Sequence, residues 1–174
     1  MKAVLFAYHE VGAAALDAML RNKIDVVAVF THRDDPSEGG WFRSVAMTAA
    51  KHGIPVHAPD DINHPIWIER VQDMGPDALV SAHYRKMIGS DMLDVCPNHC
   101  YNIHASMLPK YRGRCPINWA LVNGETETGV TLHHMTVAAD AGDIVAQQSV
   151  VIDDDDTAAT LTARIVEATG SMLD

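Results

Sequence analysis

Two polar residues near the middle of the chain, Asn102 and His104, could act together on a carbonyl group. They lie two positions apart in the strand-like run CYNIH, and alternate residues of a strand share one face. An asparagine amide can donate a hydrogen bond to a developing oxyanion, and a histidine that titrates near neutral pH can move a proton at the same carbonyl. The pair predicts an oxyanion donor beside a general acid or base. A capping asparagine and a packed histidine are the commoner occupants of such a strand end.

An aspartate further along the chain could orient His104. Asp140 lies in the turn AADAGD, between two strand-like runs. A carboxylate beside an imidazole fixes the tautomer of the ring and favours its protonated form. An aspartate that only closes an Asx-turn is the alternative. Asp143, directly before the next apolar run, is the rival for either role.

A short basic segment stands out in an otherwise acidic chain. The whole sequence has 23 acidic residues and 13 lysines and arginines, a formal net charge of −10. Lys110, Arg112 and Arg114 nevertheless fall within ten positions. Arginine matches the geometry of phosphates and carboxylates, so the segment predicts contact with a small anionic ligand. A solvated charged loop is the alternative.

Four other patterns are rejected. Ser106 lacks the G-x-S-x-G context of a serine hydrolase, and Gly12 lacks the G-x-G-x-x-G context of a dinucleotide site. The acidic run 153–156 lacks the glycine and glutamate of a calcium loop and reads as a solvated helix cap. His133 and His134 are adjacent on a strand and point to opposite faces, so they predict no shared metal.

The elements that must position these residues alternate between short apolar runs and helical stretches, which predicts a single α/β domain. Ligands of such open sheets bind beyond the carboxyl ends of the strands, where Asn102 and His104 lie. We predict strands at 2–7, 25–30, 55–57, 76–82, 100–104, 127–134 and 143–152, with a mobile loop at 31–41. Helices are predicted at 11–20, 42–52, 65–74 and 116–123, and after Thr157.

Composition limits the partners and the cellular location that we expect for the protein. The acidic balance argues against a nucleic-acid partner, and the apolar runs are far shorter than the roughly 18 residues that a membrane span needs. No signal-peptide pattern precedes the first strand, so we expect a cytoplasmic protein with its three cysteines reduced. The apolar stripe of the last helix still runs at Asp174, which predicts a domain, residues 1–174, truncated at its C-terminus.

Longer motifs carry a family resemblance. The string NIHASMLPKYRG, from Asn102, resembles the N-x-H-x-S-L-L-P-x-Y-R-G signature of folate-dependent formyltransferases, with Met107 in place of the usual leucine. The strings NGETETGVTLH, from Asn123, and ADAGDI, which contains Asp140, match the same family. The further strings FAYH, GIPV, NHP, YR and GRCPINW are similar to the formyltransferase domain of the bifunctional polymyxin-resistance enzymes, of the ArnA type. The resemblance covers nearly the whole chain.

This resemblance implies a Rossmann-like, mostly parallel sheet flanked by helices, without the C-terminal barrel-like domain of the family. It implies 10-formyltetrahydrofolate as formyl donor. Asn102 would stabilise the transition state, His104 would transfer protons and Asp140 would raise the pKa of His104. The cofactor contacts of the family fall on Lys86, Met87, Ile88, Arg114, Thr136, Val137, Ala138, Ala139 and Asp140. Lys86 stands where the closest relatives have histidine.

The same resemblance implies that the acceptor is the amino group of UDP-4-amino-4-deoxy-L-arabinose, in lipid A modification. The partners would then be a nucleotide sugar and folate, with no nucleic acid and no membrane insertion. Alternatives are a methionyl-tRNA formyltransferase, which the net charge disfavours, a glycinamide ribonucleotide formyltransferase, which the RGRCPINW string disfavours, and a deformylase. A non-catalytic module that binds folate or a nucleotide sugar is the alternative from another class.

Overall fold

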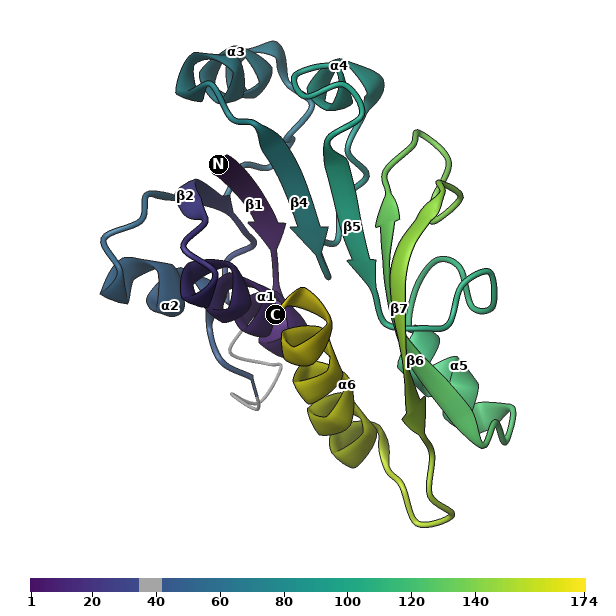
Figure 1. Cartoon of the computed structure of the whole chain (residues 1–174). Coiled ribbons are helices and arrows are strands. Elements are labelled where there is room, and N and C mark those ends of the chain that lie inside the picture. The colour runs from purple at the N-terminus through teal and green to yellow at the C-terminus, as the bar shows by residue number, and fades with distance from the viewer. Residues whose placement is uncertain (35–41) are drawn as a thin grey trace.

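A seven-stranded sheet with the order β3-β2-β1-β4-β5-β6-β7 runs through the molecule (Figure 1). The computed structural model describes residues 1–34 and 42–174, so most of the predicted loop 31–41 lies outside the described residues. Five strands are parallel: β1 (Lys2–Ala7), β2 (Asp25–Phe30), β3 (Val56–His57), β4 (Ala78–Ala82) and β5 (Cys100–His104). Two further strands, β6 (Glu127–His134) and β7 (Ile144–Val151), continue the sheet in antiparallel fashion.

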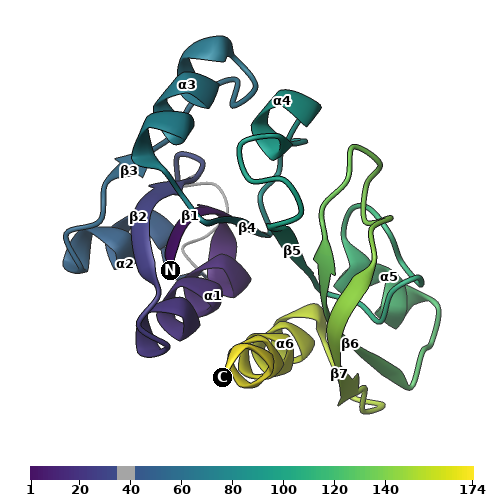
Figure 2. The same ribbon diagram turned by 45° about the horizontal axis from the view of Figure 1, so that its top comes forward.

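Helices cover both faces of this sheet (Figure 2). The helices are α1 (His9–Arg21), α2 (Val45–Lys51), α3 (Pro65–Met74), α4 (Ser90–Leu93), α5 (Pro116–Val122) and α6 (Ala158–Leu173). Strand β1 shows how the layers form, because its side chains alternate. Val4 and Phe6 are buried in a core with residues of α3 and α4, whereas Ala3 and Leu5 are buried in a core with residues of α1 and α2. The predicted α/β fold with a mostly parallel sheet is confirmed.

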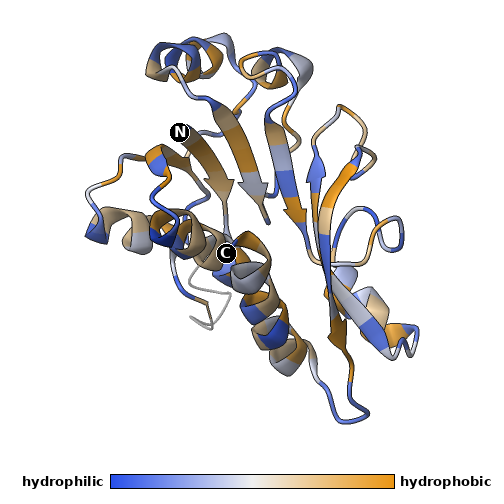
Figure 3. Cartoon of the chain, in the orientation of Figure 1, coloured by the Kyte–Doolittle hydropathy of each residue, from blue (hydrophilic) through white to orange (hydrophobic). Residues whose placement is uncertain are grey.

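The strands at the centre of the sheet are apolar, as Figure 3 shows for β1 and β4. Gly12 lets α1 lie close to them. A Cβ at this position would come within 3.0 Å of the Ala7 Cβ and 3.2 Å of the Ala82 carbonyl oxygen. The glycine is therefore explained by close helix packing at the ends of β1 and β4, and not by a dinucleotide site.

Most predicted boundaries agree with the structure to within one to three residues. Helix α3 matches its prediction at both ends, because Pro65 suits the first turn and Gly75 adopts a left-handed conformation after the last turn. The first predicted helix begins earlier, at His9, and the second begins later, at Val45, after the Ser44 cap. Helix α4 has only four residues, and its sequence lacks the repeated apolar spacing that identifies longer helices.

The acidic run 153–156 lies at the start of α6, as expected for a helix cap. Thr157 and Thr160 form a reciprocal capping box, and Arg164 forms ion pairs with Asp153 and Asp156. The three cysteines, Cys96, Cys100 and Cys115, are free thiols. Within residues 1–34 and 42–174, every helix is too short or too polar to cross a membrane.

Candidate active site

A cleft of about 470 Å³ opens where the parallel strands end, on either side of the point where the strand order changes from β1 to β4. A histidine ends or follows each of the five parallel strands; in sheet order they are His57, His32, His9, His83 and His104. His9, His83 and His104 line the cleft. In the described part of the chain, no three His, Cys, Asp or Glu side chains converge as metal ligands.

Strands β5 and β6 bring three polar side chains to this cleft. Asn102 and His104 both line it, and Asn102 pairs in the antiparallel register with His133 on β6. The sequence interpretation missed His133, because it weighed His133 and His134 only as metal ligands. Its part in the site depends on the strand register, which no local motif reveals.

Asp140 joins these residues from the turn between β6 and β7. Its Oδ1 accepts a hydrogen bond of 3.0 Å from the Asn102 amide, and its Oδ2 lies 3.5 Å from Nδ1 of His104. The Gly113 N–H donates to the same Oδ2 at 2.8 Å. The side chains of His104 and Asp140 are 7% and 12% exposed, so their interaction is only weakly screened by water.

The turn that carries Asp140 depends on a glycine. A Cβ on Gly142 would meet the His134 carbonyl oxygen at 1.9 Å, a distance that no side chain permits. Asp140 itself has a left-handed backbone, with φ of 49°. Asp143, the rival candidate, is exposed, and its backbone carbonyl accepts a hydrogen bond from the His134 N–H. The turn therefore directs Asp140, and not Asp143, toward His104.

The charge state of Asp140 follows from its partners. Burial acts to raise the pKa of this carboxyl group, but His133 and His104, which are positively charged when protonated, and the Gly113 N–H outweigh it and hold the pKa below its usual value. Asp140 is therefore ionised at neutral pH. It can orient a ring and compensate a positive charge on it.

The hydrogen bonds of the ring nitrogens define the tautomer of His104. Nε2 lies 2.8 Å from the carbonyl oxygen of Tyr111, and since a carbonyl only accepts, Nε2 carries the proton. Burial lowers the pKa of His104 below its usual value, with Asp140 and the Tyr111 carbonyl acting in the opposite direction. The ring is therefore neutral near pH 7, with Nδ1 as its basic nitrogen.

The amide of Asn102 is held from two sides. Its Nδ2 donates to Asp140 and lies 3.1 Å from Nε2 of His133, whose own Nδ1 donates to the His134 carbonyl at 2.8 Å. Both amide hydrogens thus have acceptors. Because Asp140 can only accept, the nitrogen of the amide must face it. Donation to a ligand requires one of these two hydrogens to be shared.

The basic segment divides between two surroundings. Arg114 is exposed and lines the cleft. Lys110 instead forms an ion pair with Glu125 at 3.0 Å, and Arg112 is exposed and absent from the lining of the cleft. The Ser106 hydroxyl, fully buried, donates to the Lys110 carbonyl at 2.6 Å, which explains this serine without a nucleophilic role.

Lys86, Met87 and Ile88 form one wall of the cleft, but the Lys86 side chain points elsewhere. Its ammonium group donates to the carbonyls of Pro59, at 2.9 Å, and Asp60. Asn63 secures the same wall, because its Nδ2 donates to the Met87 carbonyl at 3.0 Å and its Oδ1 accepts from the Gly89 N–H at 2.7 Å. The sequence interpretation did not identify Asn63, since the two loops meet only in the folded chain.

The remaining predicted cofactor contacts lie in the turn before and at Asp140. Thr136 and Ala139 line the cleft together with Asp140. Val137 is 65% exposed, and neither it nor Ala138 is part of the lining. The structure thus brings seven of the nine predicted contact residues, Arg114 among them, to one cleft.

Comparison of the sequence and the fold shows which known proteins this chain is similar to. The formyl transferase family model (Formyl_trans_N) matches residues 1–173. The chain is similar to phosphoribosylglycinamide formyltransferase from Bacillus halodurans, at 26% identity and a TM-score of 0.84, covering 98% of this chain and 90% of that one. The glycinamide ribonucleotide transformylase 1 of Symbiobacterium toebii gives 26% identity and a TM-score of 0.83, covering 98% and 82%.

A sugar formyltransferase shares the fold. The structure of WlaRD, a sugar 3N-formyl transferase crystallised with dTDP and 5-N-formyl-THF, matches at 23% identity and a TM-score of 0.76. The match covers 99% of this chain and 60% of that one.

Proposed function

The chain belongs to the formyl transferase family, and from this membership we propose that Asn102, His104 and Asp140 transfer a formyl group to the amine of a phosphorylated sugar or sugar nucleotide. The protein is a folate-dependent formyltransferase, and 10-formyltetrahydrofolate is its formyl donor. One observation supports the proposed roles above the others: the Asp140 carboxylate contacts the Asn102 amide and faces the His104 ring in a single cleft.

The residues of the cleft fit a folate. A pterin ring is flat, with apolar faces and a polar edge. Met87, Ile88 and Met135 supply apolar surface, while the backbone of 86–88 and the turn 136–140 supply polar groups. We propose that these segments and Arg114 hold the cofactor, with Lys86 contributing its backbone, since its ammonium group is used by Pro59 and Asp60.

When bound, 10-formyltetrahydrofolate supplies a formyl carbon attached to nitrogen. The Asn102 amide would donate to the oxygen of that formyl group, where negative charge develops as the amine attacks. His104, neutral and basic at Nδ1, would take the proton that the amine must lose, and would give it to the folate nitrogen as the bond between that nitrogen and the formyl carbon breaks. Asp140 would stabilise the resulting imidazolium through its 3.5 Å contact with Nδ1.

Positive charge in the lining of the cleft supports an anionic acceptor. Arg85 is exposed and lines the cleft in addition to Arg114, in a chain whose net charge is −10. We propose UDP-4-amino-4-deoxy-L-arabinose as this acceptor, on the resemblance of the RGRCPINW and NIHASMLPKYRG strings. Glycinamide ribonucleotide is the second candidate. Two proteins of known structure, each 26% identical to this chain, are named as formyltransferases of this compound.

A comparison of acceptors tests the proposal. The protein is mixed with 10-formyltetrahydrofolate and, separately, UDP-4-amino-4-deoxy-L-arabinose, a dTDP-3-amino sugar, glycinamide ribonucleotide or methionyl-tRNA, and release of tetrahydrofolate is followed. We expect turnover with the UDP-amino sugar. Turnover only with glycinamide ribonucleotide would show that this compound, and not the UDP-amino sugar, is the acceptor. Release of formate without an acceptor would identify a deformylase, and folate binding without turnover a binding module.

A further inference from the structure

The loop between β5 and α5 controls the His104 ring through a backbone atom. The carbonyl oxygen of Tyr111 accepts the hydrogen bond from Nε2 at 2.8 Å. This contact leaves Nδ1 without a proton in the neutral ring, on the side of Asp140. If the Tyr111 carbonyl moved, the ring would be free to adopt the other tautomer, whose proton would sit on Nδ1.

The backbone of Tyr111 does not hold this position by itself. Its φ is 57°, in the left-handed region that residues with a side chain rarely adopt. Such a conformation costs roughly 1–2 kcal/mol and persists only where surrounding contacts impose it. Contacts of the Tyr111 side chain must therefore supply part of the restraint.

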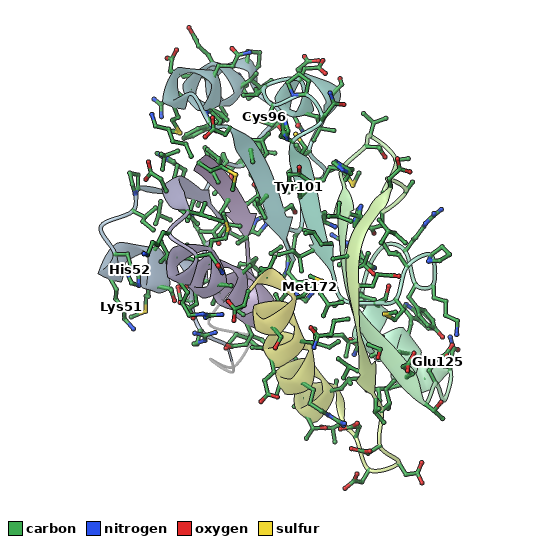
Figure 4. All side chains as sticks on the ribbon, viewed as in Figure 1. Lys51, His52, Cys96, Tyr101, Glu125 and Met172 are labelled. Carbon is green, nitrogen blue, oxygen red and sulfur yellow. The ribbon has the colours of Figure 1, made fainter. Side chains whose placement is uncertain are left out.

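The phenol of Tyr111 is anchored on the turn between α5 and β6. Its hydroxyl donates to Oε1 of Glu125 at 2.7 Å and accepts from Nδ2 of Asn123 at 3.0 Å. Both anchoring residues lie outside the lining of the cleft. Figure 4 shows Glu125 at this turn, beside α5 and away from the central strands.

We propose that Glu125 and Asn123 are positioning residues for formyl transfer, which act through Tyr111 to hold His104 in its Nε2–H tautomer. The proposal rests on the proposed role of His104. The same loop also reaches Asp140, because the Gly113 N–H donates to its Oδ2 at 2.8 Å. Loosening the phenol therefore disturbs both partners of the His104 ring, its acceptor at Nε2 and its carboxylate at Nδ1.

The first test is Tyr111→Phe, which keeps the aromatic ring and the backbone carbonyl and removes only the anchored hydroxyl. We expect kcat to fall by between about 10-fold and 100-fold, as for other small displacements of a reacting group, with KM for both substrates nearly unchanged. Glu125→Ala should have the same effect. Glu125→Gln should recover most of the rate, because an amide oxygen can still accept the phenol proton.

Glu127→Ala is the matched control. It removes a carboxylate from the first residue of β6, which is exposed and does not contact Tyr111. Asn123→Ala, which removes one of the two anchoring hydrogen bonds, gives a milder variant if Tyr111→Phe folds poorly. Melting temperatures measured in parallel identify variants whose rate falls because they unfold.

Nitrogen-15 NMR of the histidine rings separates this proposal from the proposed function. We expect the His104 signals of an Nε2–H ring in the wild type and a mixture of tautomers in Tyr111→Phe and Glu125→Ala. A tautomer shift in a protein that transfers no formyl group would leave positioning intact and overturn the function. An unchanged tautomer and kcat in both variants would overturn the positioning role, as would a rise in KM alone.

Discussion

The side-chain amide of Asn102 donates a 3.0 Å hydrogen bond to the carboxylate of Asp140, which lies 38 positions further along the chain. The contact joins the end of β5 to the turn between β6 and β7. Because the other oxygen of Asp140 faces His104, one carboxylate orients both the proposed oxyanion donor and the proposed base.

Asn102→Ala removes the proposed oxyanion donor. We expect kcat to fall by about 10²–10³-fold, which corresponds to about 2.7–4 kcal/mol of transition-state stabilisation. The melting temperature should also fall, because Asp140 and His133 each lose a buried hydrogen-bond partner. Each such loss lowers the free energy of unfolding by about 1–3 kcal/mol. Steady-state kinetics with thermal denaturation measures both effects. A change confined to KM would make Asn102 a binding residue only.

Asp140→Asn removes the charge that favours protonated His104. Since Asp140 raises the pKa of that ring, its loss should lower the pKa further below its usual value. His104 must be neutral to accept a proton, so the acidic limb of the kcat/KM profile should move to lower pH. The maximal rate should fall by roughly one to two orders of magnitude, because the ring loses its orienting partner.

Asp143→Asn is the control for this profile, since Asp143 lies in the same turn and is exposed. If Asp143→Asn shifted the acidic limb and Asp140→Asn left it in place, the wrong aspartate would have been chosen.

Asn63→Ala should weaken cofactor binding without changing the chemical step. The variant loses the two hydrogen bonds that fix Met87 and Gly89, so the cleft wall that we assign to the folate loosens. We expect KM for 10-formyltetrahydrofolate to rise about tenfold, the effect of one to two net hydrogen bonds, with kcat within about twofold. Asn22→Ala is the control. Asn22 makes comparable hydrogen bonds at the C-terminal end of α1 and does not line the cleft. An equal rise in KM in Asn22→Ala would contradict a local role for Asn63.

His83 should make the protein acid-sensitive. Burial first, and then the positive charges of His9, His104 and Arg85, lower its pKa to about 3 from the usual 6.5. Between these values the unfolded chain binds more protons than the folded one, so the free energy of unfolding should fall as pH drops from about 6.5 toward 3. The lowered pKa of His104 acts in the same direction.

His83→Asn removes this titration and suits the left-handed φ of 55°, which asparagine tolerates. The slope of melting temperature against pH should become shallower in this variant. His52, labelled in Figure 4 at the end of α2, is an exposed histidine, and His52→Asn serves as the control. An unchanged slope in His83→Asn would mean that other groups govern acid unfolding.

Local sequence determined the elements and the placement of two site residues. Short runs of apolar residues define β1, α3, β5 and β6 closely, because each is a short-range pattern of one period. Alternation along β5 then places Asn102 and His104 at one strand end by backbone geometry alone. The family motif added the identity of the chemistry, and the family model confirms the formyltransferase assignment.

Tertiary structure decided which candidates meet. Asp140 faces His104 and Asp143 does not, because Gly142 lets the turn fold against the His134 carbonyl. His133 is part of the site because it pairs with Asn102 in the strand register. The charged group of Lys86 instead contacts the carbonyl of Pro59, and that of Lys110 contacts Glu125. Each of these contacts joins segments far apart in the chain. A long flexible lysine side chain can turn toward the cleft or toward another partner. Sequence spacing fixes the position of a residue within its own helix or strand. Packing between elements determines which partner its charged side chain contacts.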